Sequence, residues 1–132
     1  MKILVLYLST AVVFFAADAI GLRLLIKPVF DRHIAHLYAD PFRVVPAAVF
    51  YLGYVVGVLW FVSVPALRAG DPVAALIGGA LLGMLAYGTY EFTNYATLRD
   101  WTMQQVIIDT IWGGVLTGFS AWAGVMIAKT LG

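Results

Sequence analysis

The chain has 132 residues, of which 63% are hydrophobic and only 11% charged, a balance far from that of soluble proteins. A formal net charge of +1 provides no basic face for nucleic acid, and the absence of cysteine excludes disulfides, thiolate catalysis and cysteine-ligated metals. A chain of this length forms one domain. We therefore expect residues 1–132 to make a single integral membrane domain.

Four apolar segments are long enough to cross a bilayer. The first begins like a signal peptide, with Lys2 before an apolar stretch, but about 24 residues of apolar sequence match a spanning helix. We predict that this segment is an uncleaved helix from about residue 3 to 26. The other helices are predicted at about 44–64, closed near Pro65, and at about 73–94 and 102–128. Because the connections are short, the sequence predicts an all-α, antiparallel four-helix bundle.

The longest connection, residues 27–43, has helical periodicity of its own. Phe30, Ile34 and Leu37 recur at helical spacing, which predicts a short interfacial helix after the first span. His33 and His36 form an H-x-x-H pattern in this segment, a weak candidate for binding zinc or iron. The alternative is that both histidines face head groups and water, and we predict no cofactor.

Small residues four apart occur on the second, third and fourth helices. This spacing lets helix backbones approach closely in a membrane. It predicts close packing within one bundle, with a homo-oligomer contact as the alternative. The pairs are Gly53 and Gly57, Gly79 and Gly83, and Gly114 and Gly118.

The distribution of Lys and Arg predicts the orientation. Five basic residues fall on the side of the first and third connections, against three on the other side: Arg23, Lys27, Arg32, Arg43 and Arg99 against Lys2, Arg68 and Lys129. The positive-inside rule places the richer side in the cytoplasm and both termini in the periplasm.

Three acids fall within the spanning segments, all towards the same side. Asp18 and Asp109 lie roughly 9–12 Å below that face at 1.5 Å per residue, and Glu91 is in the last turn of the third helix. Carboxylates at such depth are rarely incidental. Arg23 or Arg99 could reach inward to pair with them. The predicted ligand-binding residues, with Asp109 and Glu91 as acid/base candidates, are Asp18, Tyr87, Glu91, Asn94, Arg99, Gln105, Asp109 and Trp112.

A polar site near one leaflet predicts binding of a membrane lipid or small amphiphile, with membrane-lipid modification as one form of that function. Whether the protein is an enzyme stays open. One alternative is an oligomeric proton-coupled transporter or channel, against which the other half of the bilayer shows no polar path. The other is a structural or assembly subunit, whose acids form hydrogen bonds between helices.

The run from Tyr87 to Trp101, YGTYEFTNYATLRDW, is followed by DTIWG at residues 109–113. Together they resemble the bacterial membrane proteins classed as domain of unknown function 2177, over nearly the whole chain. In that family a tryptophan often stands three residues after the first aspartate; here the position is Gly21, which puts an aromatic contact with Asp18 in doubt. The resemblance implies a four-helix inner-membrane protein without an established activity. Its characteristic positions are Asp18, Glu91, Asn94, Arg99, Asp109 and Trp112.

Overall fold

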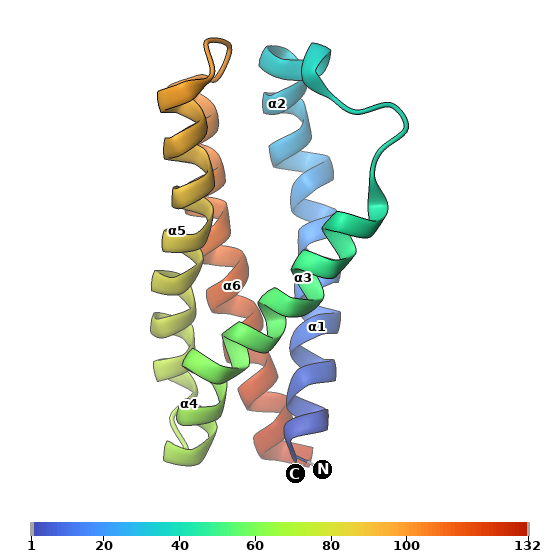
Figure 1. The fold of residues 1–132 in the computed structure, drawn as a ribbon. Helices are drawn as coiled ribbons and strands as arrows, with labels where there is room; N and C mark the ends of the chain where they lie inside the picture. The colour runs from blue at the N-terminus through green and yellow to red at the C-terminus, as the bar shows by residue number, and fades with distance from the viewer. Residues whose placement is uncertain (1, 132) are drawn as a thin grey trace.

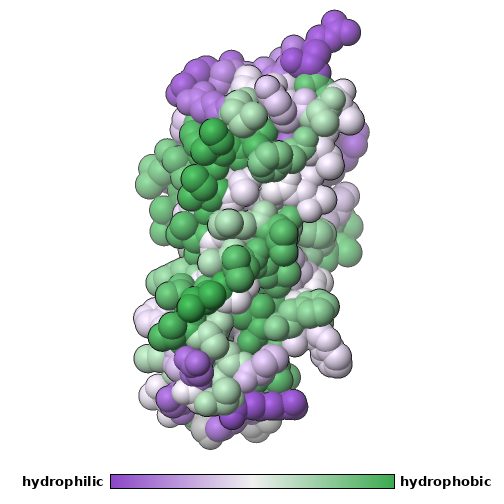
Figure 2. Space-filling view, turned by 90° about the vertical axis from the view of Figure 1, so that its left-hand side faces the viewer, coloured by the Kyte–Doolittle hydropathy of each residue, from purple (hydrophilic) through white to green (hydrophobic). Residues whose placement is uncertain are grey.

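A computed structural model describes residues 2–131, in which the chain forms long helices and no strand. Four continuous helical segments are long and apolar enough to cross a membrane: Lys2–Leu37, Val44–Ala69, Pro72–Thr97 and Met103–Leu131. They run side by side with neighbours antiparallel, and the second crosses the others diagonally (Figure 1). A broad hydrophobic zone separates two hydrophilic ends on the face drawn in Figure 2. The predicted all-α bundle of four spanning helices is confirmed.

The first helix is longer than predicted. It consists of α1 (Lys2–Gly21), the π-helical turn η1 (Leu22–Ile26), α2 (Lys27–Ile34) and the 3₁₀ turn η2 (Ala35–Leu37). The predicted end at residue 26 is wrong, because α2 continues the spanning helix (Figure 1). The separate interfacial helix predicted from this segment is not confirmed.

The second helix also passes its predicted end. It consists of α3 (Val44–Val58), the π-helical turn η3 (Leu59–Ser63) and α4 (Val64–Ala69), after which Gly70 adopts a left-handed φ of 66°. Pro65 was expected to close this helix, but it lies inside it. The polypeptide turns only beyond Ala69.

Both wrong boundaries have one physical cause. Proline lacks an N–H and its ring clashes with the carbonyl four residues back, so it normally breaks an α-helix. In each helix a π turn ends two residues before the proline, with Lys27 N–H bonded to the Leu22 carbonyl and Val64 N–H bonded to the Leu59 carbonyl. Immediately before Pro28 and Pro65, the backbone N–H thus bonds to the carbonyl five residues back and not to the one four residues back. The helix continues through each proline.

The last two helices, α5 (Pro72–Thr97) and α6 (Met103–Leu131), form a tightly packed hairpin. A Cβ built on Gly79 would lie 2.9 Å from the Gly118 Cα, and one on Gly83 would overlap the Gly113 carbonyl. These glycines therefore set the close approach of the two backbones. Gly114 likewise makes room for the side chain of Met84.

The glycine pair of α3 behaves differently. A Cβ on Gly53 or Gly57 would meet no atom within 4 Å. Close packing inside the bundle thus accounts for the glycines of α5 and α6 and not for those of α3. A contact between copies of the chain through Gly53 and Gly57 stays a prediction.

Candidate functional site

The three acids lie at the end of the bundle opposite Lys2. Glu91 comes 20 residues after Asp71, and Asp109 comes 20 residues before Lys129. Both separations correspond to about 30 Å of helix, which is the thickness of the hydrocarbon core. Measured from these charged residues, Glu91 and Asp109 lie close to the opposite boundary of the hydrocarbon. Asp18, 16 residues after Lys2, lies about 6 Å deeper than they do.

Glu91 is the most enclosed of the three acids, with no exposed surface. Its Oε1 accepts a hydrogen bond of 2.8 Å from the indole Nε1–H of Trp101. Its Oε2 receives no donor from the described residues, and the carboxyl group of Asp109 is its acidic neighbour. Two carboxyl groups in contact need a proton or a cation between them. This pair is the chemical centre of the site.

Trp101 closes the site towards the polar end of the bundle. It is 6% exposed and packs with Ile34 and Val106, while its ring meets that of Phe30 edge-on at 5.5 Å. Sequence analysis did not include Trp101 among the predicted site residues. The link to Glu91 had no local sequence signal, because the two residues belong to different elements.

Asp18 contacts an aromatic side chain that belongs to another helix. The Nε1–H of Trp112 donates a hydrogen bond of 3.4 Å to Asp18 Oδ1. A Cβ on Gly21 would overlap the Trp112 ring, so the missing side chain at position 21 admits the indole. Sequence analysis left an aromatic contact with Asp18 in doubt. The structure shows such a contact, with the ring contributed by α6 and not by α1.

Tyrosines extend the site towards the middle of the bundle. Tyr87 packs on Gly113, where a Cβ would overlap its ring, and its buried hydroxyl has no hydrogen-bond partner among the described residues. Tyr51 lies beside Tyr87 and Asp18. The Tyr54 ring lies 6.4 Å from that of Tyr87, and its hydroxyl lies 2.9 Å from Thr117 Oγ1. Sequence analysis did not include Tyr51 or Tyr54 among the predicted site residues.

The two candidate arginines do not join the acids. Arg23 and Arg99 are exposed, and the ion pairs of residues 2–131 join Lys27 to Asp31 and His36 to Asp100. Exposed arginines near a helix end turn their head groups to water, which explains the absence of pairing. The three acids therefore have no basic partner within the described chain.

Two predicted amide residues differ in role. Asn94, half-buried, lies one turn from Glu91 and near Tyr90. Gln105 is fully buried, and its Oε1 accepts from the Thr102 N–H at 2.9 Å and from the Thr102 Oγ1–H at 3.0 Å. Gln105 thus fixes the start of α6, while its Nε2 has no partner among residues 2–131.

The two histidines tie the end of the first helix to the α5–α6 connection. His33 Nε2 lies 2.9 Å from Gln104 Oε1, and His36 Nε2 lies 2.7 Å from Asp100 Oδ2. Within residues 2–131 no three His, Cys, Asp or Glu side chains gather as a metal site would require. The histidines contact α6 and its preceding loop, and the structure adds no third ligand.

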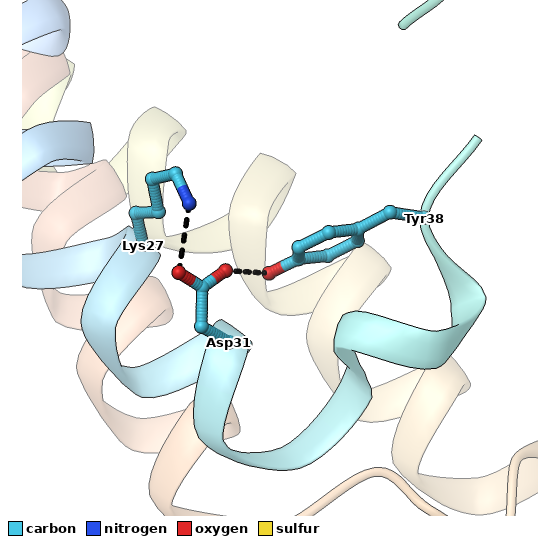
Figure 3. Close-up of polar contacts among 3 residues, drawn as sticks. All are labelled: Lys27, Asp31 and Tyr38. Carbon is cyan, nitrogen blue, oxygen red and sulfur yellow. Dashed lines mark hydrogen bonds and ion pairs between the residues drawn. The ribbon is translucent and has the colours of Figure 1, made fainter. Parts of the chain in front are cut away.

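A second polar cluster stabilises the same helix end. Asp31 bonds to Lys27 Nζ at 2.7 Å and accepts from the Tyr38 hydroxyl at 2.8 Å, as Figure 3 shows. Partial burial, together with this hydrogen bond to Asp31, raises the pKa of Tyr38 to about 12. The chain beyond η2 is thus held against α2.

The opposite half of the bundle also contains buried polar groups. The hydroxyls of Thr10, Ser63 and Ser120 are buried and have no hydrogen-bond partner in the described structure. Thr10 packs directly on Gly124, where a Cβ would overlap its Oγ1. Sequence analysis found no polar path in this half of the bilayer, and that interpretation stays a prediction, because these hydroxyls are isolated from one another in the sequence by apolar residues.

Comparison with known proteins identifies a family and no closer relative. The profile of the family described as "Predicted membrane protein (DUF2177)" matches residues 3–126. No curated protein and no solved structure matches the chain.

Proposed function

Because the chain belongs to the DUF2177 family of membrane proteins, whose description states no activity, we propose from its site that it binds a lipid or other small amphiphile. The ligand's polar head would contact Glu91, Asp109 and Asp18. The observation that supports this proposal is the absence of any basic partner for three enclosed acids in the described chain. Acidic side chains that have no basic partner inside the protein are suited to a ligand that provides the complementary group.

The level of the acids favours an amphiphile over a water-soluble ligand. Glu91 and Asp109 lie about 30 Å from the charged residues of the other end, close to the hydrocarbon boundary. This is the depth at which lipid head groups meet their chains. Any chemistry on the bound molecule would use Glu91 and Asp109 as acid and base, since these two carboxyl groups are in contact.

The proposal is tested by asking what co-purifies with the protein. We would purify the wild type, Asp109→Asn and Asp40→Asn in a mild detergent and identify bound lipids, small molecules and metals by mass spectrometry. Asp40→Asn makes the same chemical change at an exposed residue outside the site and serves as the matched control. A species retained by the wild type and Asp40→Asn but lost from Asp109→Asn supports the proposal.

The same preparations can overturn it. Identical bound species in all three proteins would show that the acids hold no amphiphile. The acids would then be assigned to contacts between helices, as expected of a structural subunit. Circular dichroism of each variant establishes that a lost ligand does not reflect a lost fold.

A second candidate, proton movement through the bundle, is favoured by one observation. The buried hydroxyls of Thr10, Ser63 and Ser120 lie in the half of the bundle away from the acids. With bound water they would provide hydrogen-bonding groups on the side where sequence analysis found no polar path. Proton flux into liposomes that is lost in both Asp109→Asn and Ser120→Ala, but kept in Thr89→Val at an exposed hydroxyl, supports this candidate; flux independent of both residues rejects it.

A further inference from the structure

We infer that the amphiphile carries a protonated amine, and that its hydrocarbon chain lies in the groove between α3 and α5. This inference rests on the proposed function and names the chemical class of its ligand. Two separate features support it: the charge of the acid site and the position of the groove.

The charge of the acid site determines which kind of head group it can bind. Glu91 and Asp109 are in contact, and Asp18 is held by a neutral indole N–H, so no described group supplies a positive charge to these acids. Glu91 Oε2 is buried and lacks a donor. An ammonium group provides three N–H donors and one positive charge, whereas phosphate or carboxylate would add a negative charge to the same small volume.

An apolar groove of about 450 Å³ runs along α3. Its lining includes Val49, Tyr54, Phe61 and, across from them on α5, Leu82. Gly53 and Gly57 form part of its wall, and their missing side chains leave the space open. The groove is part of the hydrophobic surface of two spanning helices. In a bilayer, this surface is surrounded by the hydrocarbon chains of lipids.

Two tyrosines lie between the groove and the acid site. Tyr54 lines the groove, and its ring meets that of Tyr87, which lies one turn below Glu91. Leu82 comes nine residues before Glu91, so the groove lies about 13 Å deeper in the bilayer than the acid. A lipid-like molecule with its head at the acids would direct its chain along this line. The polar site thus lies at the level of the head groups and the apolar groove at the level of the chains, as in one leaflet of a bilayer.

The probe for the test is hexadecylamine, with hexadecanol and hexadecyl sulfate as molecules of the same chain and different heads. Each is presented in maltoside detergent to immobilised protein, and the retained amount is measured by mass spectrometry. The variants are Asp109→Asn, Gly57→Leu, which fills the groove, and Ala48→Leu. Ala48 is exposed on the same helix but does not line the groove, so it is the matched control.

We expect the wild type and Ala48→Leu to retain the amine at least tenfold better than the alcohol or the sulfate. Both Asp109→Asn and Gly57→Leu should lose this retention. Because a Cβ at position 57 meets no atom within 4 Å and the groove leaves space beyond it, Gly57→Leu is expected to fold normally.

Each contrary outcome has its own meaning. Equal retention of amine, alcohol and sulfate, still lost in Asp109→Asn, rejects the amine and keeps amphiphile binding at the acids. Full retention by Gly57→Leu rejects the groove as the place of the chain. A wild type that dimerises through α3, and retains the amine only as a monomer, assigns the groove to a second copy of the chain. Retention that does not depend on Asp109 rejects the proposed function itself.

Discussion

The indole ring of Trp112 lies where a side chain at position 21 would project, and this places its N–H against Asp18. The relationship joins the first and last helices at the deepest acid of the site. It also shows that the space beside Asp18 on the first helix is filled by an aromatic ring from α6.

Gly21→Leu is expected to displace Trp112 and destabilise the protein. The new side chain would overlap the indole, and overpacking of this kind costs about 1–3 kcal/mol. Unfolding in detergent and tryptophan fluorescence measure the two effects. The double variant Gly21→Trp/Trp112→Gly should regain part of the loss, since the ring is then supplied by α1; a double variant as unstable as the sum of the singles would contradict the exchange.

Trp101→Phe should destabilise the end of the bundle that covers Glu91. The substitution keeps most of the ring but removes the donor to a buried carboxyl group, which costs about 1–3 kcal/mol. Trp60→Phe is the control, because Trp60 is 76% exposed. Thermal unfolding of both variants measures the difference, and equal midpoints would show that the Trp101–Glu91 bond adds nothing to stability.

Gly83→Ala and Gly53→Ala should differ sharply, although both add one methyl group to a glycine in a spanning helix. At position 83 the methyl would overlap the Gly113 carbonyl and force α5 away from α6, whereas at position 53 it meets open space. We expect a loss of about 1–3 kcal/mol for the first and little change for the second. Reversible unfolding in mixed micelles tests this, and similar losses would argue that Gly53 is covered in the native protein.

Tyr38 should ionise near pH 12, against an ordinary pKa of 10.0. Since the folded-state pKa is raised, the contribution of neutral Tyr38 to stability is complete below pH 10 and is lost as pH rises through 12. Asp31→Asn removes the negative charge of Asp31 and weakens its hydrogen bond with Tyr38, while the burial of Tyr38 remains, so the pKa of Tyr38 should fall part of the way. The difference in phenolate absorbance between the wild type and Tyr38→Phe reports this titration; a step near pH 10 would show that Tyr38 is free in solution.

The orientation can be read from single cysteines, because the chain has none of its own. We expect Ala69→Cys to react with a membrane-impermeant maleimide in intact bacterial cells and Asp40→Cys to react only after lysis. The reason is the excess of Lys and Arg on the side of residue 40. The reverse pattern would place both termini in the cytoplasm.

The sequence was sufficient for the spans and for placing Asp18, Glu91 and Asp109 towards the same end of the bundle, because hydropathy and helical rise are properties of the local chain. It was insufficient at Pro28 and Pro65, where a π turn changes the hydrogen-bond register and keeps the helix intact. Trp101 was missed because it lies in the α5–α6 connection and its role depends on a partner inside α5.

The first helix has a consequence for how any ligand reaches the acids. Its 36 residues measure about 54 Å, so its last turns extend past a hydrocarbon core of about 30 Å. There α2 and the α5–α6 connection meet, and Phe30 and Ile34 pack on Trp101 above Glu91. These side chains cover Glu91 from this end of the bundle. On the proposed function, an amphiphile would enter sideways, from within the plane of the membrane, and the protein would select for molecules already dissolved in the bilayer.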